Sequence, residues 1–218
     1  IITTATSALT TTKPTHSETI TKPTKFYTEP FHTPTKSDID CIHQHQIHHP
    51  IQAFSIGQKC THGYPQAYGN HPCEYKISGG LFRLTCPMLV QAIDEWEARG
   101  GVRELNDLVM GSEDLTRSFH AVNQRTVRVR KAVIDAHPGG MEKITSRLGD
   151  FNAERLLASG IAGLGPNAGV DVKCLHAHVA DQLCRPADDD SDTIGKEILR
   201  LLKVERGVAV DGSMNDCW

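Results

Sequence analysis

The sequence predicts an α+β fold that is mainly α-helical, in which a short N-terminal β hairpin packs on a bundle of five or six helices. Two observations lead to this class. Before residue 87, short apolar stretches flank a Gly79-Gly80 pair, which is typical of hairpin strands and their turn. After residue 87, apolar residues recur every three or four positions between glycine and proline breaks, which is typical of amphipathic helices.

The composition divides the chain into three parts. Only 39% of the 218 residues are hydrophobic, and the shortfall lies in the first forty residues, which are rich in threonine and proline. We therefore expect residues 1–50 to form a disordered tail rich in threonine, proline and histidine. Residues 51–206 should form a single globular domain, and residues 207–218 a frayed C-terminal tail. The N-terminal tail would be the place for a protein partner, with a transit peptide as the alternative.

Charge and cysteine content restrict the partners and the compartment. The formal net charge of −3 gives no electrostatic reason to expect a nucleic-acid or membrane partner. No apolar run approaches the ~18–20 residues that would span a bilayer. The seven cysteines are an odd number and cannot all pair within one chain. We therefore expect reduced thiols in an intracellular reducing compartment, cytoplasmic or organellar.

The first elements to consider are a histidine tract and a hairpin. Residues 41–50 hold four histidines and one cysteine, a tract that would bind metal only adventitiously because no scaffold is apparent around it. Residues 58–65 read as a turn punctuated by glycine and proline. The hairpin is predicted from Tyr75 and Ile77 on one strand and from Leu81, Phe82 and Leu84 on the other.

A helix is predicted to begin directly after the hairpin. Pro87 suits the first helical position, where its missing N–H has no consequence, so Cys86 becomes the N-cap residue. The helix should run to about Arg99 and end at the Gly100-Gly101 pair. Its inner face is predicted to bury Leu89, Ile93 and Trp96.

Further helical segments follow along the chain. They are predicted at about residues 102–109, 112–137, 141–148 and 151–159, and again from Ile194 to Leu202, where Asp192 or Thr193 would be the cap. Four arginines decorate the longest of them: Arg117, Arg125, Arg128 and Arg130. We interpret these arginines as a solvated face rather than an anion site.

The stretch from Val170 to Cys184 is the centre of the prediction. Apolar residues spaced by three or four indicate a helix, for which Asp171 is the expected N-cap. Cys174 and His178 stand four apart, so a helix would place both side chains on one face. A thiolate and an imidazole placed in this way can hold one soft metal ion.

Three signatures carry a resemblance to a known family. They are Lys59-Cys-Thr-His-Gly-Tyr-Pro65, Leu84-Thr-Cys-Pro87 with the amphipathic helix after it, and Val172-Lys-Cys-Leu-His-Ala-His178, trailed by Thr193-Ile-Gly195. With these motifs, roughly residues 51–203 resemble the largely bacterial family known as domain of unknown function 501. The resemblance implies a related fold and draws attention to the motif residues, but it implies no reaction. Relatives often have another histidine where this chain has Asp181.

The three motifs together predict a metal-binding protein. Each motif contributes one cysteine, and three thiols with one imidazole make an ordinary tetrahedral zinc set. The predicted ligands are Cys60, Cys86, Cys174 and His178, with His62 and His176 as rivals. An iron–sulfur cluster is the alternative cofactor. A shared ion requires the three sulfurs to converge, although they are distant in the sequence.

Two other functions remain open at this point. An enzyme could use Cys86 at its helix start as a nucleophile, with His176 or His178 as the base and an unknown substrate. Alternatively, the chain is an interaction module without a cofactor, in which the thiols are buried only for packing.

Overall fold

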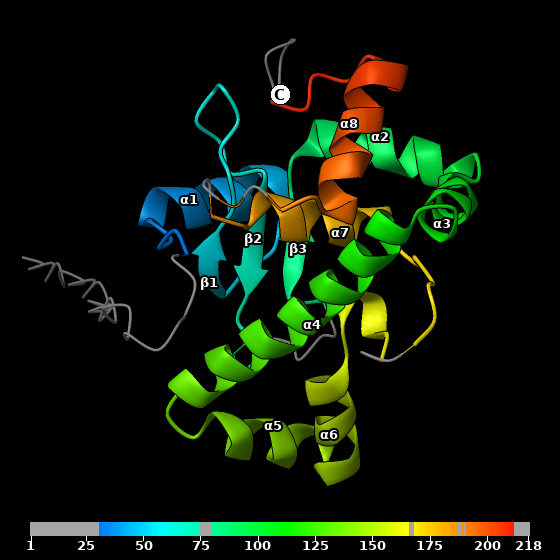
Figure 1. The fold of residues 1–218 in the computed structure, drawn as a ribbon. Coiled ribbons are helices and arrows are strands. Elements are labelled where there is room, and N and C mark those ends of the chain that lie inside the picture. The colour runs from blue at the N-terminus through cyan, green and yellow to red at the C-terminus, as the bar shows by residue number, and fades with distance from the viewer. Residues whose placement is uncertain (1–30, 75–79, 166–167, 187–188, 190, 212–218) are drawn as a thin grey trace, which may run out of the picture.

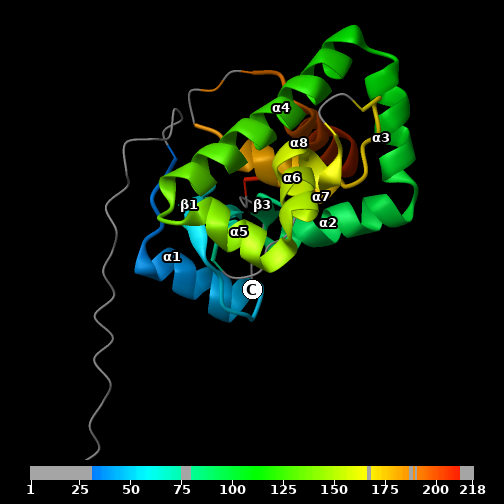
Figure 2. The same ribbon diagram turned by 90° about the horizontal axis from the view of Figure 1, so that it is seen from below.

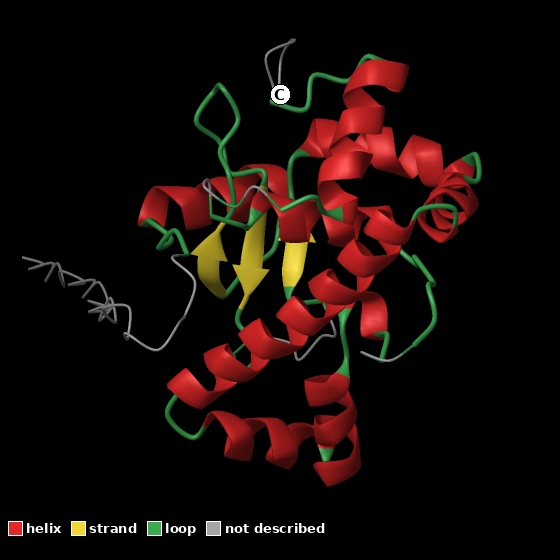
Figure 3. Cartoon of the chain, viewed as in Figure 1, coloured by secondary structure: helices red, strands yellow, loops and turns green. Residues whose placement is uncertain are grey.

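The computed structural model describes residues 31–74, 80–165, 168–186, 189 and 191–211. This part of the chain is mostly helical and contains one small antiparallel sheet, as Figure 3 shows. The α+β, mainly α-helical class predicted from the sequence is therefore confirmed. Among these residues no helix is both long and apolar enough to cross a membrane.

The sheet has three strands in the order β1-β2-β3: β1 (Ala53–Ile56), β2 (Ala67–Asn70) and β3 (Phe82–Leu84). The predicted strand at Phe82 is present, but it pairs with β2, with Tyr68 opposite Arg83. Tyr75 and Ile77, the other half of the predicted hairpin, lie outside the described residues. Strand β2 escaped prediction because all four of its residues are buried, so it lacks the alternation of a half-exposed strand.

The helices surround this sheet (Figure 1). Besides α1 (Lys36–Cys41), they are α2 (Pro87–Ala98), α3 (Gly101–Met110), α4 (Glu113–Ala136), α5 (Gly140–Leu148), α6 (Asp150–Ala158), α7 (Leu175–Leu183) and α8 (Ile194–Arg206). A π-helical turn at Ile42–Gln46 and a 3-10 turn at Ile161–Gly163 complete the described elements. Helix α4 is the longest and crosses the molecule diagonally in Figure 1.

Helix α2 has the start that the sequence predicts. Cys86 is its N-cap residue with an extended backbone, and Pro87 occupies the first helical position. Gly100 has a positive φ of 95°, which ends the helix and starts α3 at the next residue. Trp96 is 1% exposed and faces inward with Leu89 and Ile93, so the predicted inner face is confirmed.

Helix α7 lies at the centre of the main core. It packs against β3, α2 and α8, and its Leu175 and Val179 are fully buried. The contact with α8 is close because Gly195 lies over the α7 backbone. A Cβ atom at Gly195 would stand 2.2 Å from the His178 carbonyl oxygen, so only glycine fits there. The main core therefore fixes how α7 is oriented.

A second, smaller core lies at the C-terminal end of α4. Helices α5 and α6 pack there, below the sheet in Figure 1 and toward the viewer in Figure 2. The buried residues of this core are Cys73, Ile134, Ile144, Ala153 and Leu156. The described helices therefore divide between separate cores, whereas the sequence predicts one bundle of five or six helices. Helical periodicity shows which face of a helix is buried but not against which neighbour.

Part of the segment predicted as an N-terminal tail has regular secondary structure. Residues 1–30 lie outside the described residues, but Lys36–Cys41 form α1, which begins with a reciprocal capping box between Thr35 and Asp38. Ile42 is fully buried in a small cluster that also includes Tyr68. Asp38 also pairs with Lys59 at 2.6 Å. The few apolar residues of this segment pack on the sheet, and this packing is enough to hold the segment in place.

The C-terminal segment also differs from the expected frayed tail up to residue 211. The Gln66 side-chain amide donates a hydrogen bond to the Val210 carbonyl at 2.8 Å, and the Thr61 N–H donates to Asp211 at 2.9 Å. Residues 212–218 lie outside the described residues. The last described residues are therefore held against the turn at 58–65.

Candidate functional site

The chain reaches α7 through an extended segment. The backbone N–H and carbonyl of Val172 both bond to the side-chain amide of Asn106, at 2.8 and 2.9 Å. This pairing holds the segment extended, so α7 begins at Leu175 with Cys174 as its N-cap residue, at φ −154° and ψ 112°. Cys174 therefore stands just outside the helix with an extended backbone, so the argument that places it on one helical face with His178 does not apply. Asp171, the expected cap, precedes the true cap by three residues.

Glu97, at the end of α2, supplies the cap that Cys174 does not. The Cys174 side chain makes no capping hydrogen bond. Instead the first amide of α7, Leu175 N–H, donates to Glu97 Oε1 at 2.7 Å. A carboxylate at a helix N-terminus is favoured by the helix dipole. This contact places the Glu97 carboxylate next to Cys174.

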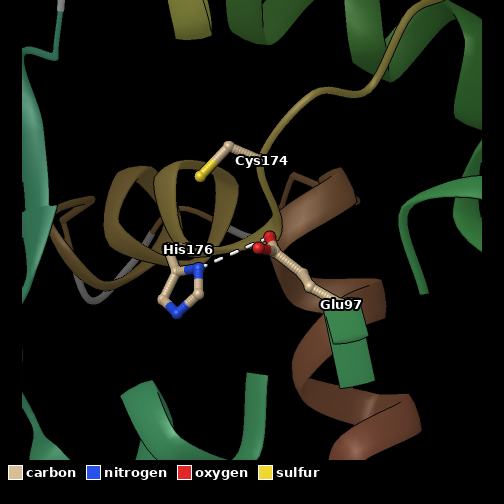
Figure 4. Close-up of side chains that lie close together, drawn as sticks. All are labelled: Glu97, Cys174 and His176. Carbon is tan, nitrogen blue, oxygen red and sulfur yellow. Dashed lines mark ion pairs between the residues drawn. The ribbon is translucent and has the colours of Figure 1, made fainter. Parts of the chain in front are cut away.

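His176 lies between the ends of α2 and α7. Its Nδ1 faces Glu97 Oε1 at 3.4 Å, and its Nε2 lies 3.3 Å from both the Val90 carbonyl oxygen and Asp94 Oδ1. In Figure 4 a dashed line joins the His176 imidazole to the Glu97 carboxylate, and the Cys174 side chain lies at the start of α7. Within the described ranges, Glu97, Cys174 and His176 form the one group of three potential ligands whose atoms all lie within 4.8 Å of one another.

The surroundings of His176 favour its charged form. Burial lowers its pKa, but the hydrogen bond to Cys174 and the charges of Glu97, Cys174 and Asp94 outweigh burial and raise the pKa to about 9. The imidazole is therefore an imidazolium at neutral pH, surrounded by acceptors. Because negative groups surround this histidine, the same position would also suit a metal cation.

The other predicted ligands do not join this group. Cys60 is buried in the turn at 58–65, and Cys86 is 3% exposed in the main core. No three of the four predicted ligands bring their ligand atoms within 4.8 Å of one another, although the structure describes all four. His62, one of the two rivals, is exposed in the same turn as Cys60. The predicted set of four ligands is therefore not assembled around one point.

His178 faces the opposite way from His176. It is 1% exposed, its ring lies 6.1 Å from that of Phe119 on α4, and neither ring nitrogen has a hydrogen-bond partner in the described part of the chain. Two residues along a helix turn a side chain by about 200°, so His176 reaches α2 while His178 enters the core. Burial lowers the pKa of His178 to about 4, against a smaller opposing effect of Asp181.

The neutral burial of His178 predicts a loss of stability in acid. Its pKa is about 4 in the folded state and 6.5 when the chain unfolds, so between these values only the unfolded chain binds the proton. Stability is complete above pH 6.5 and falls as the pH drops toward 4. Between pH 7 and 5 this residue should cost the protein about 2 kcal/mol.

The check is urea unfolding at both pH values for the wild type and for His178→Leu. The variant should lose about 2 kcal/mol less stability than the wild type over this interval. His71, whose pKa burial also lowers to about 4, titrates in both proteins and cancels in the comparison. An equal acid sensitivity of the two proteins would mean that His178 is not held neutral.

Glu97 is the member of this group that sequence reasoning missed. One signal was available, because an acid in the last turn of a helix opposes the helix dipole. Such a residue calls for a compensating partner, here the N-terminus of α7. The identity of that partner depends on how α2 and α7 pack, which the sequence does not state.

Comparison with known proteins adds a family but no activity. A family model described as a protein of unknown function (DUF501) matches residues 56–200, which is more than half of the chain. The match includes all three cysteine motifs and the whole of α7. No curated protein and no solved structure matches the chain.

Proposed function

Because this chain belongs to the DUF501 family, whose description assigns no activity, we propose its function from the site itself: it is a zinc-binding protein that uses Glu97, Cys174 and His176. The observation that carries the proposal is the convergence of one sulfur, one imidazole nitrogen and one carboxylate oxygen within 4.8 Å. These three ligand types are the ones that zinc takes in proteins.

The spacing suits a tetrahedral ion. Zinc held at its usual ligand distances would separate these three atoms by about 3.3–3.6 Å, so only a small inward movement of the side chains is needed. Three protein ligands leave a fourth position for water or for a substrate. Open positions of this kind belong to catalytic zinc sites, so enzyme activity with an unknown substrate is compatible with the proposal.

The groups behind the ligands support the same role. A metal-binding histidine usually donates its second ring N–H to a carbonyl or carboxylate, and His176 Nε2 faces the Val90 carbonyl and Asp94. Glu97 Oε1 is oriented by Leu175 N–H, which leaves the second carboxylate oxygen for the ion. Each ligand except Cys174 is therefore already oriented by a neighbour.

The proposal keeps zinc but changes the ligand set expected from the sequence. Cys60 and Cys86 are replaced by Glu97, and His178 by its rival His176. An iron–sulfur cluster suits this group less well, because such clusters are held mainly by thiolates and only one thiol belongs to the group.

Zinc content tests the proposal. Full-length protein purified without an affinity tag should contain a stoichiometric amount of zinc by elemental analysis. Cobalt-substituted protein should show a thiolate-to-metal charge-transfer band. Cys174→Ser and Glu97→Gln should each bind zinc at least about tenfold more weakly than the wild type, because each removes one of three ligands. Zinc retained at wild-type affinity by Cys174→Ser would contradict the proposal.

Two controls separate this site from adventitious binding. Cys41→Ser removes a half-buried thiol outside the group and should keep the zinc. Replacing the four histidines between residues 43 and 49 with asparagine should also leave one zinc site intact. If that replacement removes all zinc, the histidine tract and not Cys174 holds the ion.

The pH dependence of zinc affinity gives an independent measure. Metal binding must displace the proton from His176, whose pKa is raised to about 9, so affinity should increase as the pH rises toward 9. One displaced proton makes the apparent affinity rise about tenfold per pH unit, or at least about 100-fold between pH 6 and 8. A constant affinity over this range would exclude His176 as a ligand.

Thiol chemistry is the second candidate function, and one observation favours it. Cys174 stands at the N-terminus of α7 beside the His176 imidazolium, an arrangement that serves cysteine nucleophiles. The nucleophile would then be Cys174 rather than Cys86, with Glu97 orienting the histidine. The same experiments separate the two functions. A protein that binds no zinc, but whose Cys174 is alkylated by iodoacetamide much faster than Cys41, would favour the thiol function.

A further inference from the structure

A second candidate site lies beyond the other end of α7. A cleft of about 270 Å³ separates one face of α4 from the connection between α7 and α8. Ser118, Arg125 and Arg128 line it from α4, and Arg185 and Thr193 line it from the opposite side. Arg185 follows α7, whereas Cys174 precedes it, so the nine-residue helix separates the cleft from the Glu97–Cys174–His176 group by about 14 Å of helix.

The α4 wall of the cleft is one helical stripe. Apart from the adjacent pair Ala121 and Val122, its residues follow one another at intervals of three or four, which aligns their side chains along one face. The stripe comprises Ser118, Ala121, Val122, Arg125 and Arg128. Ala121 and Val122, in the middle of the stripe, are small and leave the cleft open. Ser118 and the two arginines place hydrogen-bond donors at its ends.

Two of the cleft arginines are rigidly built into the fold. The side chains of Arg125 and Arg185 are 5% and 6% exposed, and both bind the buried carboxylate of Asp181, at 2.5 and 3.0 Å. Arg125 also stacks over the Phe82 ring at 5.2 Å. These contacts fix the orientation of two guanidinium groups in the wall of the cleft, a preorganised arrangement of donors for an anion.

Other donors at the cleft have no partner within the described residues. Ser118 Oγ is buried there without a hydrogen bond, and Arg128 makes neither an ion pair nor a hydrogen bond. The two carboxylates that line the cleft are both engaged, Asp189 with Arg185 at 2.8 Å and Asp192 with Lys196 at 3.1 Å. The positive charge of Arg128 is therefore left uncompensated at the opening.

The start of α8 adds a favourable dipole. Thr193 caps this 13-residue helix and also lines the cleft, so the positive end of the helix is directed at the same space. The sequence interpretation of the α4 arginines as a solvated face was wrong for Arg125 and Arg130, which are 4% and 1% exposed.

We propose that this cleft binds a phosphate group, carried by a small phosphomonoester. Arginine provides the planar, multiple donors that match phosphate oxygens, and a serine hydroxyl with a helix N-terminus is their usual complement. The cleft is larger than a phosphate ion alone, which leaves room for part of the esterified group. This site is independent of the zinc site, since no residue is shared.

The test measures binding of inorganic phosphate and of glycerol 3-phosphate to the full-length protein by isothermal titration calorimetry at low salt. We expect saturable binding of both, with the ester binding more tightly. Arg128→Gln should weaken binding about tenfold or more, and Ser118→Ala by several fold, because each removes a direct donor. Both variants should fold normally, since Arg128 is exposed and Ser118 has no partner to lose.

Arg117→Gln is the matched control. Arg117 is an exposed arginine on the same helix, but it pairs with Asp114 and does not line the cleft. It should bind phosphate as the wild type does. Equal weakening in Arg117→Gln and Arg128→Gln would show general attraction to surface charge and would overturn the proposal. Absence of saturable binding in the wild type would overturn it as well. Tighter binding of inorganic phosphate than of the ester would identify the free ion as the ligand class.

Discussion

Asp181→Ala should lower the free energy of unfolding by about 3–5 kcal/mol. Asp181 is 1% exposed and accepts hydrogen bonds from Arg125 at 2.5 Å and from Arg185 at 3.0 Å. The carboxylate joins α4 to the end of α7. Its removal leaves two guanidinium groups buried with less than their full complement of partners, which is far more costly than losing an exposed ion pair.

Urea unfolding followed by circular dichroism at pH 7 measures this effect. Asp192→Ala is the control, because it removes a carboxylate that is 91% exposed and pairs with Lys196 within one helical turn. That change should alter stability by less than about 1 kcal/mol. A similar small loss in Asp181→Ala would mean that water reaches the two arginines.

Trp96→Ala should lower the free energy of unfolding by about 3–5 kcal/mol, the usual effect of deleting a large buried aromatic side chain. The indole is 1% exposed in the main core, and its Nε1 donates to Glu104 Oε2 at 2.7 Å. The Arg206 guanidinium lies 4.3 Å from the ring centroid. Gly101 makes room for the ring, since a Cβ atom there would stand 2.5 Å from it.

Trp96→Phe separates packing from polar contacts. Phenylalanine keeps most of the apolar volume and loses the hydrogen bond to Glu104, so it should cost only about 1–2 kcal/mol. The same urea unfolding experiment compares the two variants. If alanine and phenylalanine cost the same amount, the hydrogen bond would dominate, and the core around α2 would be less well packed than the structure indicates.

Local signals in the sequence determined several features without help from the fold. The Cys-Pro pair at 86–87 places the start of α2 because proline at the first helical position needs no N–H partner. The spacing of Leu89, Ile93 and Trp96 identifies the buried face of α2. The motif residues around Cys60, Cys86 and Cys174 also identify the family.

Features that depend on distant contacts were decided only by the tertiary structure. The helical period separates His176 from His178, but only the packing of α7 shows that His176 meets α2 and that His178 is buried against α4. Likewise, the sequence of α1 predicts a disordered tail, because a few isoleucines stabilise a segment only when they can pack on another part of the protein.

The candidate site combines both kinds of information. The cysteines and histidines of the sequence led us to expect a metal site near Cys174, because thiolate and imidazole are common zinc ligands. The third proposed ligand, Glu97, is 77 residues earlier in the chain than Cys174 and reaches it only because α2 packs against α7. Residue chemistry is local and can be read from the sequence. Which side chains converge depends on how the helices pack, and this packing is determined by the free energy of the whole core.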